Sequence, residues 1–551
     1  MASPQPHLRA GRKALDAGQA KRAILHFTRA IAADPRQAEA LLGMARACRL
    51  EGRRIDALKA LDRIIVTGQA SAASWILTGD LLAELREWAQ ALDAYRHALA
   101  MDRGNPMVHH QLAAAAYRLG EADLAAGHLK EAAAGNPGSG SLASLASMIP
   151  GVPAASQQEI LDVRRQLAKR LAEGSECAGR VRPGPYANPR PRVGYLSGHF
   201  NGENYMKPVW ALLNHHDRSR FEVHLFSTAE DPSLGFAGYR PDPADRLHAV
   251  GSLSNAELAG FIAEQQIDLL VDLGAYSSVE RLELFLSPVA PVVATWFNAF
   301  ATSGMPGIDV IIGDDESVRP EEERFYSESV RRLPLSYLTF QVTHEVPPVA
   351  APPCLVNRHL TFGSLVTGYK IVPEVLDAWC AILRGAPGSR LVLANSLLAS
   401  RQNVHWWQQR FADRGIDPQR LDLLPPAGHR EFLGYYDRID VALDAFPYNG
   451  GTTTMEAIWQ GVPVLTFDGD RWASRTSQTL LRRSHLAGFV AASVDGMIAT
   501  ATSLAADPGF PERLAVLRRE MRDRLATAPV CDGAGLAAAM ESLYADLLEG
   551  C

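Results

Sequence analysis

Cysteine, excess positive charge and long apolar runs are all scarce in this sequence of 551 residues. The six cysteines are scattered and form no Cys-x-x-Cys pair, which favours reduced thiols over a disulfide framework or a zinc knot. A formal net charge of −6 argues against a broad nucleic-acid surface, which needs clustered lysine and arginine. No apolar run reaches the length of a membrane span, and the first residues lack the apolar core of a signal peptide. We therefore expect a cytoplasmic protein that has no membrane span and binds no nucleic acid.

The remaining composition is that of an ordinary globular protein, with 47% hydrophobic and 21% charged residues. The chain is too long for a single hydrophobic core, so its length predicts three or four domains.

A repeat of 34 residues runs through the first quarter of the chain. Small residues recur at this interval, each followed four positions later by a large one: Ala23, Ala57, Ala91 and Ala125. This spacing is typical of two antiparallel helices that pack closely. The period resembles that of tetratricopeptide repeats, whose concave faces bind polypeptides; the alternative is a plain helical bundle with a chance period. We predict helical repeats over residues 1–146 that bind a protein partner, then a linker and one helix over 147–188.

Short β-branched runs alternate with helical or loop stretches after residue 189. The pattern covers residues 189–345, stops at the proline-rich joint VPPVAAPPC, and starts again over 354–551. Buried parallel strands with intervening helices have this pattern. We predict two Rossmann-like α/β halves with a ligand cleft at the carboxyl ends of their strands.

The stretch FPYNGGTTTME (446–456) lies between a strand-like and a helix-like run. Glycines permit close approach and unusual φ angles, and the free amides and dipole of a helix start attract an anion. The alternative is a threonine N-cap on a core helix, with the glycines turning the chain. The candidate phosphate-binding residues are Asn449, Gly450, Gly451, Thr452, Thr453 and Thr454.

Neighbouring motifs favour the phosphate site over the simple cap. FGSLVTGYKI (362–371) places Thr367 and Lys370 near a strand end, where a cation can meet a leaving diphosphate. Glu456, which we expect on the first helical turn, is within reach of a ribose. Ser474 and Arg475 belong to WASRTSQTLL, a second loop-to-helix step rich in hydroxyls.

The motifs FGSxxxxxKI, FPYNGGTTTMEAIWQGVPVLT and ASR, in this order behind a helical repeat, resemble the catalytic region of O-linked N-acetylglucosamine transferases and the related Spindly proteins. The resemblance covers about 190–545 and implies a GT-B fold, with the nucleotide sugar held mainly by the second half. It implies that Lys370, Thr452 and Thr453 bind the diphosphate. It also implies that Glu456 binds the ribose and that Ala427 and His429 lie near the base.

The chemistry that this resemblance implies is inverting transfer of a sugar to Ser or Thr of a protein acceptor, with UDP-GlcNAc as the favoured donor. No cofactor and no metal are expected. The Asp-Gly-Asp stretch at 468–470 is interpreted as a solvated turn, and not as the metal-binding motif of another glycosyltransferase fold.

Departures from the family pattern leave the sugar and the general base open. His199 stands where the family has an aspartate, and Glu203 stands where it has a histidine. A second family histidine is replaced near Ala275, and Phe432 stands where human-type enzymes stack a histidine on the base. Glu203 is a candidate base if burial raises its pKa, and otherwise a solvated loop acid. Further candidates on the acceptor side are His199, Lys207, Asn298 and Thr302.

Three alternatives to this function arise from those departures. In the first, the donor is another nucleotide sugar, such as GDP-fucose or a nonulosonic sugar delivered to flagellin. In the second, the sugar is transferred to asparagine. In the third, the chain is a repeat scaffold whose catalytic half has decayed. The sequence leaves the acceptor protein and a homo-oligomeric state undetermined.

Overall fold

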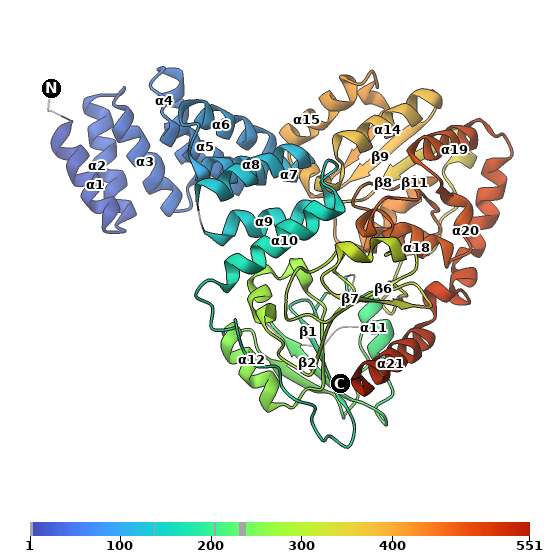
Figure 1. The fold of residues 1–551 in the computed structure, drawn as a ribbon. Helices are drawn as coiled ribbons and strands as arrows, with labels where there is room; N and C mark the ends of the chain where they lie inside the picture. The colour runs from blue at the N-terminus through green and yellow to red at the C-terminus, as the bar shows by residue number, and fades with distance from the viewer. Residues whose placement is uncertain (1–3, 137, 203–204, 231–237, 551) are drawn as a thin grey trace. The chain divides into compact units, whose positions relative to one another are not determined.

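The structure is a computed structural model that describes residues 4–136, 138–202, 205–230 and 238–550 (Figure 1). It divides into two compact units. The first comprises Met1–Ser141 with Leu397–Trp407, and the second comprises Leu142–Ser396 with Gln408–Cys551. No helix in the described ranges is both long and apolar enough to cross a membrane.

Antiparallel helix pairs build the first unit, two helices in each period. Their bounds are α1 Gln5–Asp16, α2 Ala20–Ala33, α3 Ala38–Leu50, α4 Arg54–Val66, α5 Ala72–Glu84, α6 Trp88–Met101, α7 Pro106–Arg118 and α8 Ala122–Gly135. The small residues of the repeat lie on the second helix of each pair and are fully buried. Gly79 of α5 faces Tyr95 of α6 so closely that a Cβ would lie 2.4 Å from the ring. The predicted helical repeat is confirmed, and a glycine opposite a large side chain sets the helix separation.

A parallel seven-stranded sheet forms the first half of the second unit, in the order β3-β2-β1-β4-β5-β6-β7. Its strands are β1 Arg192–Ser197, β2 Glu222–Ser227, β3 Arg246–Ala249, β4 Leu269–Asp272, β5 Val292–Thr295, β6 Val310–Asp314 and β7 Ser329–Leu333. The helices before and within this half are α9 Ser139–Met148, α10 Gln157–Ala172, α11 Lys207–Leu213 and α12 Asn255–Glu264. The sequence did not predict β3 and β7, because these edge strands are largely polar and exposed.

A parallel six-stranded sheet forms the second half, in the order β10-β9-β8-β11-β12-β13. Its strands are β8 Thr361–Ser364, β9 Arg390–Ala394, β10 Leu421–Leu424, β11 Val441–Leu443, β12 Val464–Phe467 and β13 Val490–Ala491. Its helices are α13 Cys354–Asn357, α14 Pro373–Gly385, α16 His429–Gly434, α17 Thr452–Trp459, α18 Thr476–Arg482, α19 Val494–Ala506 and α20 Phe510–Ala526. Helix α15 (Arg401–Ala412) follows β9 in the chain, and its residues up to Trp407 belong to the first unit. Two Rossmann-like halves after a helical repeat confirm the predicted fold.

The last helix, α21 (Gly533–Glu549), leaves the second half and packs against α11 of the first. Tyr544 and Tyr195 share a hydrogen bond of 3.2 Å between their hydroxyls, and Glu541 lies 2.8 Å from Nδ1 of buried His216. The sequence assigned this helix to the second half, because no local pattern marks the crossing. Buried His216 contributes to this contact between the halves.

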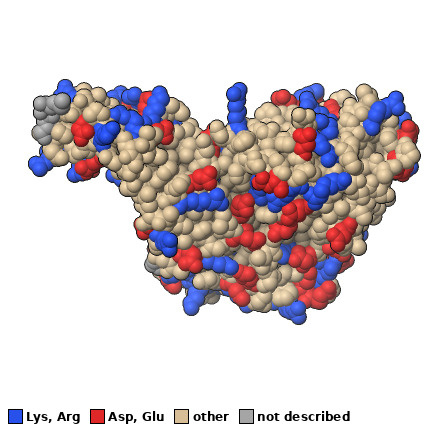
Figure 2. Space-filling view, turned by 90° about the horizontal axis from the view of Figure 1, so that it is seen from above, with Lys and Arg blue, Asp and Glu red and all other residues tan. Residues whose placement is uncertain are grey.

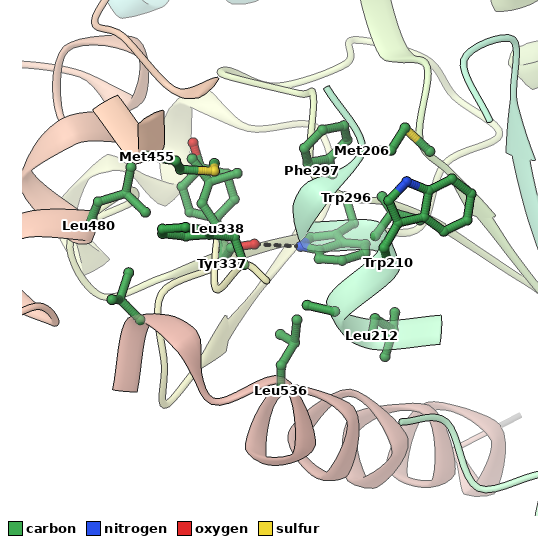
Figure 3. Packing of buried hydrophobic residues seen from close by; sticks show 14 of the residues in the cluster. Met206, Trp210, Leu212, Trp296, Phe297, Tyr337, Leu338, Met455, Leu480 and Leu536 are labelled. Atoms are coloured by element: carbon green, nitrogen blue, oxygen red, sulfur yellow. Dashed lines mark hydrogen bonds between the residues drawn. The ribbon is translucent and has the colours of Figure 1, made fainter. Parts of the chain in front are cut away.

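One continuous hydrophobic cluster joins the two halves (Figure 3). Trp210 and Trp296 of the first half lie in the same cluster as Met455, Leu480 and Leu536, which come from α17, α18 and α21. The Trp296 Nε1–H donates to the backbone carbonyl of Tyr337 at 3.1 Å. The halves therefore share a core, and they cannot separate without exposing apolar surface.

Candidate active site

The strand order reverses between β1 and β4 in the first sheet and between β8 and β11 in the second. Ligands of open parallel sheets bind at the carboxyl ends of strands at such points. In the first sheet, His199 comes after β1 and Asp272 ends β4. In the second, Lys370 comes after β8 and Asp444 directly after β11. The predicted motifs therefore lie at both points where this fold binds ligands.

Free backbone amides mark the start of α17. The helix begins at Thr452. Its first backbone hydrogen bond is donated by the Met455 N–H to the carbonyl oxygen of Gly451, at 3.0 Å. No side chain caps this helix, and the structure, in the part of the chain that it describes, gives the amides of Thr452, Thr453 and Thr454 no partner. Three donors and the positive end of the helix dipole form an anion site here. The alternative of a threonine N-cap is wrong, because Gly451 occupies the cap position.

Asp444 holds the loop that leads into this helix. Its Oδ1 accepts hydrogen bonds from the amides of Ala445 and Gly450, both at 2.9 Å, and its Oδ2 accepts one from Thr466 Oγ1 at 2.8 Å. Burial raises the pKa of Asp444, and the amide of Gly450 opposes that shift. Asp444 was not predicted from the sequence, although its place at the end of a strand next to a glycine-rich loop was a usable signal.

Gly450 serves close approach in this loop, whereas a Cβ at Gly451 would lie at ordinary contact distance, 3.6 Å, from its nearest neighbour. A Cβ at Gly450 would lie 2.6 Å from the hydroxyl oxygens of both Thr453 and Thr454. Neither Gly450 nor Gly451 has a positive φ, so the expectation of an unusual φ is wrong. The loop is tight because its own threonine side chains fold back over it.

Lys370 reaches the same loop from the other side of the switch point. Its Nζ donates to the backbone carbonyl of Asn449 at 2.6 Å and lies 3.8 Å from the centre of the Tyr448 ring. Burial lowers the pKa of Lys370 to about 8, and the nearby Asp444 carboxylate acts against this shift. The ammonium is therefore charged at neutral pH, beside the loop that opens α17.

Glu456 forms a buried cluster with a lysine and a histidine. Its Oε1 accepts hydrogen bonds from Lys207 Nζ at 3.2 Å and from His429 Nε2 at 3.1 Å. Burial alone would raise the pKa of Glu456, but Lys207 and His429 outweigh it and hold this pKa below its ordinary value. Lys207, expected on the acceptor side, thus meets a residue expected to bind the ribose. Glu456 lies one turn further into α17 than the sequence predicted, because the helix starts earlier.

The other second-half candidates divide into exposed and structural residues. Thr367 is exposed, and Ala427 is half-buried just ahead of α16. The Thr454 hydroxyl is buried and lies 2.7 Å from Ser477 Oγ, while Asn449 Nδ2 donates to Ala445 O at 2.7 Å. The side chains of Thr454 and Asn449 therefore shape the loop. The amide of Asn449 donates to Ala473 O at 2.9 Å and its carbonyl accepts from Lys370, so of these two residues only the amide of Thr454 remains for a ligand.

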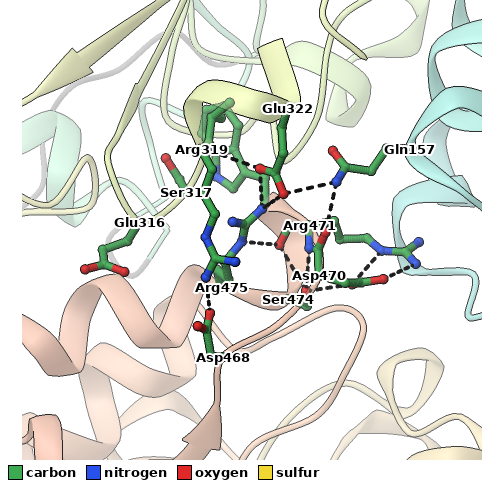
Figure 4. A network of polar contacts seen from close by, with 12 residues as sticks. Gln157, Glu316, Ser317, Arg319, Glu322, Asp468, Asp470, Arg471, Ser474 and Arg475 are labelled. Carbon is green, nitrogen blue, oxygen red and sulfur yellow. Dashed lines mark hydrogen bonds and ion pairs between the residues drawn. The ribbon is translucent and has the colours of Figure 1, made fainter. Parts of the chain in front are cut away.

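Ser474 and Arg475 belong to a polar network that joins the two halves (Figure 4). The fully buried Arg475 donates from Nη2 to both oxygens of Glu322, at 2.7 and 2.5 Å. Ser474 Oγ donates to Asp470 Oδ1 at 3.1 Å. Ser474 Oγ and Nη2 of Arg475 are engaged in protein contacts, and the expectation that these two residues hold the donor stays a prediction.

The Asp-Gly-Asp turn borders the same network, and Asp470 is exposed as expected of a solvated turn, whereas Asp468 is half-buried. Asp468 pairs with Arg319 of the first half, and Asp470 pairs with Arg471 at 2.8 Å. Within the described ranges, no group of three or more His, Cys, Asp or Glu side chains is arranged to hold a metal ion.

The first half presents fewer free groups. His199 is half-buried and lies edge-on to Tyr205, with 5.1 Å between the ring centres, and burial lowers its pKa. Its imidazole is therefore neutral at pH 7 and able to accept a proton. Glu203 lies outside the described residues.

Asp272, at the end of β4, is a further residue that was not predicted from the sequence. Its oxygens accept the amides of Gly274 and Ala275, both at 3.0 Å, and the Thr295 hydroxyl at 3.3 Å. Burial raises the pKa of Asp272 to about 6, against these hydrogen bonds.

Asn298 and Thr302 form hydrogen bonds with other loops of the first half. Asn298 Nδ2 donates to the carbonyl of Gly274 at 3.1 Å, and the buried Thr302 hydroxyl donates to Glu328 Oε2 at 2.7 Å. Arg164 of α10 lies over the Tyr276 ring at 3.8 Å and donates to the Thr302 carbonyl. The expectation that the Thr302 side chain faces an acceptor is therefore not supported by its geometry.

Charged side chains of both signs are interspersed over the face shown in Figure 2. This agrees with a net charge near zero for a chain of this length.

Comparisons with known proteins bear on both parts of the chain. The family model for glycosyl transferase family 41 matches residues 182–346 and 354–536, more than half of the sequence. A tetratricopeptide repeat model matches residues 14–81.

Two curated plant proteins are similar to the catalytic part. One, from Oryza sativa subsp. japonica, is described as a "probable UDP-N-acetylglucosamine–peptide N-acetylglucosaminyltransferase SPINDLY"; it is 31% identical over 359 residues, 64% of this chain and 38% of that protein. The other, the SEC protein of Arabidopsis thaliana described as the same kind of transferase, is 26% identical over 62% of this chain and 35% of its own length. The chain thus spans less than two fifths of the length of these relatives.

A solved structure matches almost the whole chain. A mutant of the Thermobaculum terrenum O-GlcNAc transferase superposes with a TM-score of 0.74 at 28% sequence identity. The match covers 93% of this chain and 98% of that one. The order of a helical repeat and two α/β halves is therefore the same in both.

Proposed function

Because the chain belongs to glycosyl transferase family 41, we propose that it transfers a sugar from a nucleotide diphosphate donor to a protein. The observation that carries this proposal is the start of α17, where three free amides lie next to a loop held by Lys370. Departure of a nucleoside diphosphate leaves negative charge on its terminal phosphate. Fixed donors and one ammonium stabilise that charge without reorganising as the bond breaks.

The donor side of the site is assigned to the second half. Thr452 and Thr453 bind the diphosphate through their amides and half-buried hydroxyls, and Lys370 contacts it from the opposite side. Glu456 takes the ribose, and the segment from Ala427 to His429 lies beside the base. UDP-GlcNAc is the donor that the descriptions of the plant relatives and of the bacterial structure support.

The acceptor side is assigned to the first half and to the repeats. A Ser or Thr hydroxyl must lose a proton as it attacks the sugar, and neutral His199 and Glu203 are the candidate acceptors of that proton. The tetratricopeptide repeats supply a surface for the acceptor protein, as such arrays bind polypeptides along their concave face. No metal is needed in this scheme, because the amides and Lys370 perform the electrostatic role.

Ligand-induced thermal stabilisation tests the donor assignment. We expect UDP to raise the melting temperature of the full-length protein, since a ligand at a hundred times its Kd stabilises the folded state by about 2.7 kcal/mol. Stabilisation by GDP or CMP instead would indicate a fucose-type or nonulosonic donor. No stabilisation by any of the three would favour a repeat scaffold without catalysis.

Transfer itself is tested by intact-mass analysis of candidate acceptor proteins incubated with UDP-GlcNAc. We expect the mass increment of one N-acetylhexosamine and its release by alkaline β-elimination, which breaks O-linkages to Ser and Thr. An increment that resists elimination would indicate transfer to asparagine.

A further inference from the structure

A buried ion pair crosses from one half to the other. Lys207 of α11 and Glu456 of α17 are 2% and 5% exposed, and their charged atoms lie 3.2 Å apart. The neighbours of Lys207 on α11, Pro208, Val209 and Trp210, are all buried in the core of the first half. Burying an ammonium costs free energy that an apolar residue of similar size would not, so stability alone is a weak reason for lysine here.

The hydrogen bonds of Glu456 are unevenly divided between its two oxygens. Lys207 Nζ and His429 Nε2 both donate to Oε1. Among the residues that the structure describes, none donates to Oε2. A carboxylate accepts on both oxygens, so Oε2 of a nearly buried side chain remains as an acceptor for a ligand hydroxyl.

We propose that Lys207 is a positioning residue for the nucleotide, which holds the Glu456 carboxylate so that Oε2 accepts a ribose hydroxyl. This inference rests on the proposed function, and it adds that a residue of the first half controls donor binding in the second. Lys207 and His429 together fix the carboxylate through one oxygen and turn the other outward. The positive charge of Lys207 also keeps the carboxylate ionised, and ionised acceptors form the stronger hydrogen bonds.

The charged and titratable groups around Glu456 come from three elements. Lys207 faces it from α11 and His429 from α16, and Tyr436 lies near it from a 3₁₀ turn, Tyr435–Arg438. His344 packs against the His429 ring with 5.1 Å between ring centres. Without Lys207, burial is the dominant influence on Glu456, and the carboxyl group takes up a proton at a higher pH.

The experiment compares a nucleoside diphosphate with its 2′-deoxy and 3′-deoxy analogues in the full-length protein. The measured quantity is the ratio of Kd for the deoxy form to Kd for the ribo form, using UDP or whichever diphosphate the wild type binds. Titration of the phosphate affects both ligands equally, so it cancels in this ratio. For the wild type we expect one deoxy analogue to bind about tenfold or more weakly, the effect of losing a hydrogen bond to a charged group, with no change between pH 8 and 6.

The Lys207→Met variant should lose most of this discrimination, and the loss should increase as pH falls from 8 to 6. Lys207→Arg should restore part of it. Glu456→Gln should show weak discrimination at every pH. Lys169→Met, which removes an exposed lysine from α10, is the matched control and should behave as the wild type.

Two results would overturn the proposal. One is a wild-type protein that binds the ribo and both deoxy forms equally; the other is a Lys207→Met variant with a lower melting temperature but unchanged discrimination. If Lys207→Met does not fold, the neutral pair Lys207→Met with Glu456→Gln replaces it, and wild-type discrimination in that double variant also overturns the proposal. A wild type that binds no nucleoside diphosphate contradicts the proposed function itself.

Discussion

Both halves of the catalytic unit hold a loop with a buried aspartate at the switch point of the sheet, but the segments that follow the two aspartates differ. In each, a buried aspartate at the carboxyl end of the strand beside the switch point accepts two amides of the adjoining loop. The next strand supplies a threonine hydroxyl to the same carboxylate. Asp272 bonds with Gly274, Ala275 and Thr295 in the first half, and Asp444 bonds with Ala445, Gly450 and Thr466 in the second.

The halves differ in the segment that the chain enters after the aspartate. Beyond Asp444 it enters the α-helix α17, whose first amides have no partner in the described structure. Beyond Asp272 it enters two 3₁₀ turns, Ala275–Ser277 and Val279–Leu286. A short 3₁₀ turn has poorer hydrogen-bond geometry and no aligned dipole of several turns. The hydrogen-bonded aspartate therefore supports an anion site in the second half, while in the first half it only fixes a loop beside His199.

The largest expected effect is on turnover, and it tests whether the first half carries out proton transfer. Glu203→Gln and His199→Gln remove basicity and keep polarity. We expect the variant that lacks the true proton acceptor to lose two to four orders of magnitude in turnover, the usual contribution of general acid–base catalysis. UDP affinity should remain within about twofold of the wild type, since neither side chain is assigned to the nucleotide or to the Lys207–Glu456 pair.

Turnover and UDP affinity measured on the same preparations separate the outcomes. Full turnover in both variants would assign proton transfer to water. A large loss of UDP affinity in either variant would contradict the division into a donor half and an acceptor half.

The next largest effect concerns the charge in the second half. Lys370→Ala should reduce turnover by about a hundredfold or more, the scale for losing one preorganised partner of the departing diphosphate. The free energy of unfolding should fall by no more than about 1 kcal/mol, because one half-buried hydrogen bond is lost. Steady-state kinetics and chemical denaturation measure the two quantities. If the folded variant transfers sugar at nearly the wild-type rate, Lys370 is not part of the diphosphate site.

A pH series sharpens the same assignment. Since the pKa of Lys370 is lowered to about 8 by burial, the free protein loses the ammonium charge as pH rises through 8, and binding a diphosphate must then take up a proton. UDP affinity should be flat with respect to this group below pH 7 and about tenfold weaker at pH 9. Calorimetric titration in buffers of different ionisation enthalpy measures that uptake.

Lys370→Arg is the control for the pH series, because a guanidinium stays charged throughout this range. Its affinity should not fall between pH 8 and 9. An equal fall in both proteins would assign the titration to another group.

The smallest effect compares a glycine from each loop. Gly450→Ala places a Cβ 2.6 Å from two threonine hydroxyls, whereas Gly274→Ala places one 3.1 Å from Ser278 Oγ. We expect Gly450→Ala to weaken UDP binding several-fold and to destabilise the protein by about 1–3 kcal/mol, as overpacking does. Gly274→Ala should leave UDP affinity unchanged. Equal effects on affinity would mean that both loops contact the nucleotide.

The parts of the molecule that could be predicted share a local origin. The 34-residue spacing of alanines, the β-branched runs of the central strands and the NGGTTT helix start are each complete within a short segment. Their backbone consequences need few distant residues, so the repeat, both sheets and the anion site could be predicted from pattern alone. Edge strands β3 and β7 escaped prediction because one or both faces are solvated and carry polar residues.

The roles of individual side chains were harder to predict, because they depend on which residues the fold brings together. Arg475 and Thr302 carry polar groups in motifs that suggested ligand contacts, yet Glu322 and Glu328 occupy those groups from elsewhere in the chain. Nothing in the sequence near either residue indicates its partner.

By itself, the sequence determined the order of domains, the two parallel sheets and the position of the helix start to which we assign the diphosphate, because helix periodicity, strand composition and helix starts are properties of contiguous residues. Only the tertiary structure decided that α21 returns to the first half and that Lys207 meets Glu456 across 249 positions of the chain. Such pairings arise when separate elements bury their faces in one common core, and the energy of each contact depends on residues that lie far apart in sequence.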